Sequence, residues 1–277
     1  MKKLIVLSLI IIFALGFLSS CKKKKGTAPT LPPAASMTID FTNFESGAKS
    51  IDFASASKGV ENSSWEFSAL VAGYWKTIIA TTLAVPVASF KIALDQTATW
   101  VEEKTWQWNY TVTVLGSTYK ARLVGLIQTT DVKWTMYVTK EGTGGFAEFV
   151  WFEGTSKIDG TSGQWILNHS SAYKEPVLQI DWTKTGTDLY TVKYTYVRTL
   201  NDNRASDTFK GSYIEYGKTS ATAAYYTIHY WNGTAFSDMN VEWNPSDKSG
   251  RVKCLAFFGD TKWYCWNGNH VNITCPQ

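Results

Sequence analysis

Three cysteines near the C-terminus have the most definite chemistry, because they could form a disulfide or hold a metal. Cys254, Cys265 and Cys275 lack the Cys-x-x-Cys spacing of zinc sites, so we predict no metal centre. Residues 251–258 and 261–266 look like two strands joined by a Gly-Asp hairpin loop. In that register Cys254 faces Cys265, which predicts a disulfide between them, with a bond to Cys275 as the alternative.

Carboxylates placed on strands could perform acid–base hydrolysis, since glycosidases need only two such groups in one cleft. The candidates are Glu148, Asp181, Glu215 and Glu242. Each could have a raised pKa in apolar surroundings, or could face solvent and pair with a basic side chain on the next strand. The chain has no motif for phosphate, dinucleotide or zinc-dependent chemistry. We therefore predict no catalytic residue and no cofactor, and keep a hydrolase only as an alternative.

The first 21 residues have the layout of an export signal. Residues 1–3 are basic, residues 4–17 are apolar, and Leu-Ser-Ser-Cys follows at 18–21. The apolar run is shorter than the about 20 residues that a membrane-spanning helix needs. The final tetrad resembles the lipobox of bacterial lipoproteins. This resemblance implies that residues 1–20 are a signal peptide and that Cys21 is lipidated and becomes the mature N-terminus.

A basic and then proline-containing segment follows the expected lipid. Residues 22–25 are four lysines, and residues 26–36 contain three prolines and no charge. We expect 21–36 to be a lipidated N-terminus with a flexible linker, and 37–277 to be one domain. The lysines could contact anionic headgroups or simply be solvated. Lysines rather than acidic residues after the cysteine favour a periplasm-facing place on the outer membrane.

Charge gives no indication of nucleic-acid binding. Six of the 27 basic residues lie at 2–3 and 22–25, so the rest of the chain has 21 basic against 23 acidic residues. The net charge of +4 thus comes from the signal and the anchor region. The domain itself is slightly acidic, which is not typical of proteins that bind nucleic acid.

One amphipathic helix is predicted early in the domain. Residues 63–66, Ser-Ser-Trp-Glu, fit a capping box. Apolar side chains then recur at helical spacing and predict a helix over about 64–85 that packs on a sheet. These side chains are Phe67, Leu70, Val71, Tyr74, Trp75, Ile78 and Ile79. Pro86 ends or kinks this helix, and 87–94 could form a second short one.

The rest of the chain alternates polar and apolar residues, which is typical of strands. Turn signals separate the runs, which favours antiparallel strands in up-and-down order. So many strands curl or close, so we predict a large curved sheet or partly closed barrel with the helix packed on it, a β-sandwich being the alternative. In outline this is similar to the half-barrel of periplasmic lipoprotein carriers, a likeness of topology that transfers no ligand residue. The predicted strands are 37–44, 50–56, 104–114, 119–127, 132–138, 146–153, 164–169, 176–182, 189–198, 208–216, 223–231 and 239–243, followed by the cysteine hairpin.

Aromatic residues are abundant, with 13 Trp and 14 Tyr, and suggest two binding functions. In the first, one strand face binds an apolar ligand or lipid inside the curved sheet, unless its rings are simply core. Its candidates are Trp106, Trp108, Tyr110 and Trp134. In the second, aromatic rings near loops bind a polysaccharide or a protein partner. Its examples are Trp231, Trp243, Trp263 and Trp266.

Overall fold

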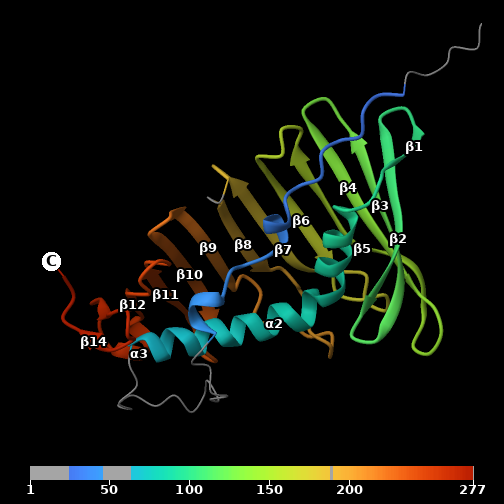
Figure 1. Cartoon of the computed structure of the whole chain (residues 1–277). Helices are drawn as coiled ribbons and strands as arrows, with labels where there is room; N and C mark the ends of the chain where they lie inside the picture. The colour runs from blue at the N-terminus through green and yellow to red at the C-terminus, as the bar shows by residue number, and fades with distance from the viewer. Residues whose placement is uncertain (1–24, 46–63, 188–189, 277) are drawn as a thin grey trace, which may run out of the picture.

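The computed structural model describes residues 25–45, 64–187 and 190–276, and the expected signal peptide, Cys21 and the predicted strand 50–56 lie outside them. Fourteen antiparallel strands follow one another in chain order in one curved sheet (Figure 1). They are β1 (Thr99–Glu102), β2 (Thr105–Val114), β3 (Ser117–Ile127), β4 (Asp131–Lys140), β5 (Phe146–Lys157), β6 (Ser162–Asn168), β7 (Pro176–Lys184), β8 (Tyr190–Tyr196), β9 (Tyr213–Ser220), β10 (Ala223–Trp231), β11 (Phe236–Trp243), β12 (Gly250–Lys253), β13 (Tyr264–Trp266) and β14 (Asn272–Ile273). The prediction of a curved up-and-down sheet with a helix packed on it is confirmed. The sheet is not closed into a barrel, since β1 and β14 are its two edges.

The strict alternation of strand direction divides the strand ends between two rims. The turns β1–β2, β3–β4 and every second turn after them lie at one rim, and the other turns lie at the opposite rim. We call the first the Gly–Trp rim, after the pairs described next. We call the second the α2 rim, because the first arm of helix α2 (Ser64–Ala93) runs along it (Figure 1).

Tryptophan rings on the concave face lie over glycines of the neighbouring strand near the first rim. Four register pairs show this arrangement, Gly125–Trp134, Gly154–Trp165, Gly163–Trp182 and Gly250–Trp266. A Cβ atom added at any of these glycines would lie only 2.3 to 2.8 Å from the paired ring. The four rings are at most 3% exposed. The absence of a side chain on one strand therefore makes room for the largest side chain on the next.

Helix α2 covers the concave face in two arms. Ser64–Ala80 and Thr82–Ala93 are bent by 67° from each other. Pro86 explains the bend. Its ring clashes with the carbonyl of residue 82, and it lacks the backbone N–H that would donate a hydrogen bond to that carbonyl. The second short helix that the sequence suggested over 87–94 thus corresponds to the second arm of α2. No single helix of the described segments is long and apolar enough to cross a membrane; the two arms satisfy length and composition only as a bent pair.

Residues 25–45 form a second cover, which we call the strap, and Figure 1 shows it crossing the concave face above the first arm of α2. It contains the short helices η1 (Ala34–Met37) and η2 (Thr42–Phe44). Lys25 Nζ lies 5.5 Å from the centroid of the Trp106 ring, and Trp165 Nε1 donates to Ser36 Oγ at 3.2 Å. At the far end Phe44, 2% exposed, contacts four aromatic rings, among them Trp243 and Trp266.

The strap corrects two predictions. The segment expected to be a flexible linker over 21–36 is packed on the sheet from about residue 28 onward, because its uncharged side chains lie against the apolar concave face. The strand expected over 37–44 is a strap with short helical turns instead. Met37, Ile39 and Phe41 are buried as the alternation predicted. Alternation indicates which side chains face a core, but it does not require the backbone to pair with a strand.

The predicted Cys254–Cys265 disulfide was wrong, and Cys265 is bonded to Cys275 with Cα atoms 5.1 Å apart. Strand β12 pairs with β13 so that Arg251 faces Cys265, and the chain leaves β12 before Cys254. Residues between the strands form a short helix, α3 (Leu255–Phe258), which ends at Gly259 with a φ of 81°. A glycine at positive φ serves a helix end as well as a hairpin turn, so the Gly-Asp pair was ambiguous. Cys254 remains a free, buried thiol whose pKa is raised by its burial.

We predict that Gly154→Ala destabilises the fold strongly. The added Cβ would lie 2.1 Å from Gln164 O and 2.6 Å from Trp165 Cε3, so strand β6 would have to shift. Overpacking of this kind costs about 1–3 kcal/mol of unfolding free energy. Urea denaturation followed by tryptophan fluorescence measures it. Gly26→Ala, where nothing lies within 4 Å, is the matched control and should change stability by less than about 0.5 kcal/mol. Equal stability of the two variants would contradict the packing role of these glycines.

Candidate functional site

The aromatic group first expected to bind a ligand belongs to the core. Trp106, Trp108 and Trp134 are at most 6% exposed. The Tyr110 hydroxyl donates to the carbonyl of Ser89 in the second arm of α2 at 2.6 Å, and burial raises the pKa of this tyrosine. All four side chains contact other parts of the chain, and none of them lines the cavity described below.

The loop aromatics proposed for glycan binding do not form one surface. Trp243 and Trp266 are buried beneath the strap, at 6% and 1% exposure. Trp263 is partly exposed and lies against two cations, with Arg251 4.4 Å from its ring centroid. Trp231 alone of the four lines the cavity. The structure thus separates these rings into core, surface and cavity positions.

The strand carboxylates are paired on the solvent side of the sheet. Glu148 accepts from Arg122 at 2.7 Å, and Glu242 forms a 2.6 Å ion pair with Arg251. Asp181 accepts from the amides of two glutamines, and Glu215 accepts from the Tyr225 hydroxyl. Each carboxylate thus has a partner of its own, on the same strand or one or two strands away, which is the arrangement of surface pairs rather than of two acids sharing a cleft.

A cavity of about 850 Å³ lies beneath the first arm of α2. Its opposite wall is formed by the start of β7, the end of β8, the residues before β9 and the end of β10, and α3 contributes to its side. All of these strand ends belong to the α2 rim. The cavity therefore lies at the rim opposite the Gly–Trp pairs, between these strand ends and the first arm of α2.

The cavity walls are mostly apolar and carry no ionised side chain. Helix α2 contributes the same stripe that predicted its packing on a sheet, including Phe67, Val71 and Trp75. The sheet contributes Leu178 and Tyr230, among others. Phe67 stacks on a ring of α3 with centroids 3.8 Å apart, which closes the cavity on that side. Such walls favour an apolar occupant, because burying a charge in them would be costly.

Three large apolar side chains of the lining are also exposed to solvent. Tyr74, Ile78 and Phe209 are 49%, 37% and 51% exposed, and we call them the lips of the cavity. Tyr74 and Ile78 lie on one side of the opening, on α2, and Phe209 lies in the loop before β9 on the other. Exposed apolar groups gathered around an opening are typical of a contact or ligand site.

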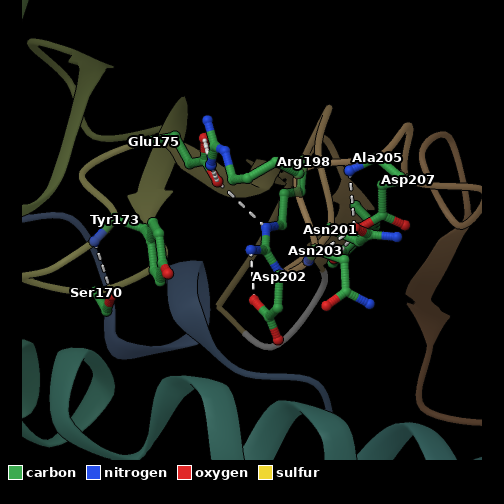
Figure 2. Close-up of polar contacts among 11 residues, drawn as sticks. Ser170, Tyr173, Glu175, Arg198, Asn201, Asp202, Asn203, Ala205 and Asp207 are labelled. Carbon is green, nitrogen blue, oxygen red and sulfur yellow. Dashed lines mark hydrogen bonds and ion pairs between the residues drawn. The ribbon is translucent and has the colours of Figure 1, made fainter.

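A polar cluster fixes the loops that carry one wall. Figure 2 shows Arg198 directed between Glu175 and Asp202, with distances of 3.4 and 2.6 Å. Arg204 reaches the same glutamate at 3.2 Å, so the loops after β6 and β8 are tied together. Arg198 is only 5% exposed. Its hydrogen bond and charge lower the pKa of the Asp202 carboxyl.

Tyrosine hydroxyls at the cavity remain protonated at neutral pH. Burial, and then the hydrogen bond to Asp207 at 2.8 Å, raises the pKa of Tyr196 to about 12. Burial also raises the pKa of Tyr230, whose hydroxyl lies 3.8 Å from Cys254 Sγ. Both rings therefore act as apolar wall with a neutral donor at the edge.

Neither a metal centre nor a known relative identifies the site. Among residues 25–45, 64–187 and 190–276, no group of three His, Cys, Asp or Glu side chains is placed to hold a metal ion. Comparison of the chain with family models, curated proteins and solved structures found no match. The site is therefore interpreted from its own geometry.

Sequence reasoning found one wall of the cavity and missed the other. The α2 stripe was recognised but assigned wholly to core packing. On the sheet wall, Val177, Tyr196 and Ser212 lie at strand ends that contact each other only after folding, so no local pattern marked them. The signal that could have indicated a cavity is the width of the apolar stripe on α2. The stripe is wider than the face that packing buries, since Tyr74 and Ile78 belong to it and yet remain exposed.

We predict that Arg198→Met lowers the unfolding free energy by about 1–3 kcal/mol, because it removes hydrogen bonds to two carboxylates from a buried position. Thermal unfolding monitored by circular dichroism measures the change. Arg122→Met is the control, since its ion pair with Glu148 is exposed and should contribute no more than about 1 kcal/mol. If both variants lose the same stability, the Arg198 cluster has no special role in holding these loops.

Proposed function

We propose that the chain is a lipid-anchored protein of the bacterial envelope that binds an apolar ligand and catalyses no reaction. The cavity beneath α2 carries this proposal. Its volume of about 850 Å³ is within the range typical of small-molecule sites. Its walls offer aromatic and aliphatic surface with no ionised group, which suits an apolar ligand rather than a sugar or a nucleotide.

The hydrophobic effect favours binding of a ligand in the cavity. Apolar surface that a ligand removes from water contributes roughly 25 cal/mol per Å². The lips Tyr74, Ile78 and Phe209 present such surface, and a ligand seated between them would cover it. In contrast, the Gly–Trp half of the concave face is filled by its own side chains, so binding there would need the core to open.

The anchoring part of the proposal rests on residues 1–25. The lipobox-like tetrad at 18–21 supports lipidation of Cys21, and the lysines behind it support a periplasm-facing place on the outer membrane. Lys25 is already seated beside Trp106 at the start of β2. Four residues span at most about 14 Å, so a lipid on Cys21 would stay close to the Gly–Trp rim.

The cavity would then face away from the anchoring membrane. Strand β2 has ten residues, which corresponds to about 33 Å between the two rims. The lips lie at the α2 rim, and the strap begins at the opposite one. A protein tethered in this way would exchange its ligand at the side that points away from the bilayer that holds it.

We predict that blocking the cavity abolishes ligand binding without unfolding the protein. Ala256 lies exposed on α3 in the cavity lining, so Ala256→Trp should fill the opening at little cost to stability. The apolar fluorophore phenylnaphthylamine should bind the mature protein, and the variant should bind it at least about tenfold more weakly. Ala80→Trp, an exposed α2 position outside the lining, is the matched control and should bind as the parent does. Undiminished binding by Ala256→Trp would reject the cavity as the site.

We predict that the two ends of β2 differ in their distance from the membrane. A single fluorescent label on Glu103→Cys, at the Gly–Trp rim, should be quenched by brominated lipid in vesicles that hold the acylated protein. The same label on Leu115→Cys, at the α2 rim, should be quenched far less. The native cysteines leave few competing thiols, because Cys254 is buried and Cys265 is in a disulfide.

Unacylated protein carrying Cys21→Ser is the control for this measurement and should show no quenching at either label. Equal quenching at both ends of β2 in the acylated protein would contradict the proposed orientation.

A further inference from the structure

We infer that the cavity takes an uncharged, single-chain lipid whose ester or hydroxyl oxygen is hydrogen-bonded by Ser212. The inference rests on the proposed function and narrows it to a chemical class. It depends on three features of the lining: the lack of ionised side chains, one buried hydroxyl without a partner, and the place of that hydroxyl close to the lips.

The lining selects against a charged group inside the cavity. Arg198 of the polar cluster is paired with Glu175 and Asp202 and does not contribute to the lining. An ionised carboxylate or phosphate drawn into these walls would lose its hydration without gaining a partner. The part of the ligand that enters is therefore neutral.

Ser212 supplies the unpartnered polar group of the cavity lining, as far as the described residues show. It lines the cavity at 6% exposure, and its hydroxyl has no hydrogen-bond partner among the described residues. Its backbone is fully used, since its N–H donates to Phe209 O at 2.9 Å and its carbonyl accepts from the Tyr196 N–H at 2.8 Å. A buried hydroxyl is normally satisfied, so a ligand oxygen is the natural partner.

The other polar side chains near the opening are already engaged or exposed. The Asn232 amide donates to Ser237 Oγ at 2.9 Å, and its oxygen accepts two backbone N–H groups of its own turn. The Tyr196 hydroxyl donates to Asp207. Thr82 and Thr234 are exposed and can be satisfied by water. Ser212 is thus the lining residue with a buried and unmet hydrogen-bonding capacity.

The position of Ser212 sets the direction of the ligand. It follows the lip residue Phe209 by three positions and is joined to it by the backbone hydrogen bond. An oxygen bonded to Ser212 therefore lies just inside the opening. The chain would extend inward along Trp75 and Phe67 of α2, and any larger headgroup would remain outside between the lips.

The test compares three ligands of one chain length, each as a competitor of bound phenylnaphthylamine. Monolauroylglycerol is neutral and has an ester, dodecane has no polar atom, and laurate is ionised at about pH 8. We expect monolauroylglycerol to compete well and laurate poorly. Ser212→Ala should weaken monolauroylglycerol binding by about fivefold to tenfold and leave dodecane binding unchanged. Ser212→Thr, which keeps the hydroxyl, should restore much of the lost affinity.

Ser89→Ala is the matched control. Ser89 is also fully buried with an unpartnered hydroxyl, but it lies in the second arm of α2 and not in the lining. It should change the affinity for none of the three ligands. If Ser212→Ala affects monolauroylglycerol and dodecane alike, or if laurate binds as well as the ester, the inference is overturned while the proposed function stands. If the parent protein binds neither fluorophore nor dodecane, the proposed function itself fails.

Discussion

The concave face of an open fourteen-stranded sheet must be kept from water, and every other feature of this fold follows from that requirement. A closed barrel would bury the face by itself, but here β1 and β14 remain separate edges. The chain supplies two covers instead, the strap and helix α2. Where both covers lie close to the sheet, Gly–Trp pairs fill the space. Where the first arm of α2 runs along the α2 rim, the cavity remains between the helix and the strand ends.

The division between a filled half and a hollow half has a simple steric origin. Near one rim each glycine lets a tryptophan ring of the next strand lie flat beneath the strap, as at Gly154 and Trp165. Near the other rim the sheet carries branched and aromatic residues of ordinary size, such as Val177 and Tyr230, and no ring fills the remaining depth. The bend at Pro86 also contributes, because it directs the second arm into the sheet and leaves the first arm along its edge.

Much of this fold is predictable from the sequence, since it depends on short-range patterns. Alternation indicated most of the strands and the apolar stripe indicated α2, because each pattern reflects the face that its own element buries. The two-residue strand β14 and the short helix α3 were not predicted, and a disulfide to Cys275 was only the alternative, because these features depend on a register set by the neighbouring strands. The first part of the strap, up to residue 36, was mistaken for a flexible linker, because a proline-containing, uncharged sequence is compatible both with a solvated linker and with a segment packed on an apolar sheet. The cavity was missed because its walls come from α2, α3, three strands and the loop before β9, and no local pattern reports how far apart such elements stand.

The proposed anchor would lie near one rim and the cavity lies at the other, which gives the proposed function a spatial order. In the sequence, the lipobox-like cysteine and residues 22–24 precede the strap, which begins with Lys25. The strap crosses the concave face from the Gly–Trp rim and ends beside the first turns of α2, where Phe44 contacts Trp65. The most direct test of the proposed function is native mass spectrometry of the acylated protein purified gently from its own membranes. A ligand-binding protein predicts an added, non-covalent mass of one small apolar molecule per chain, which is absent from Ala256→Trp and present in Ala80→Trp. A spectrum with no added mass in any of the three proteins, together with no uptake of neutral lipid supplied in excess, would contradict the proposed function.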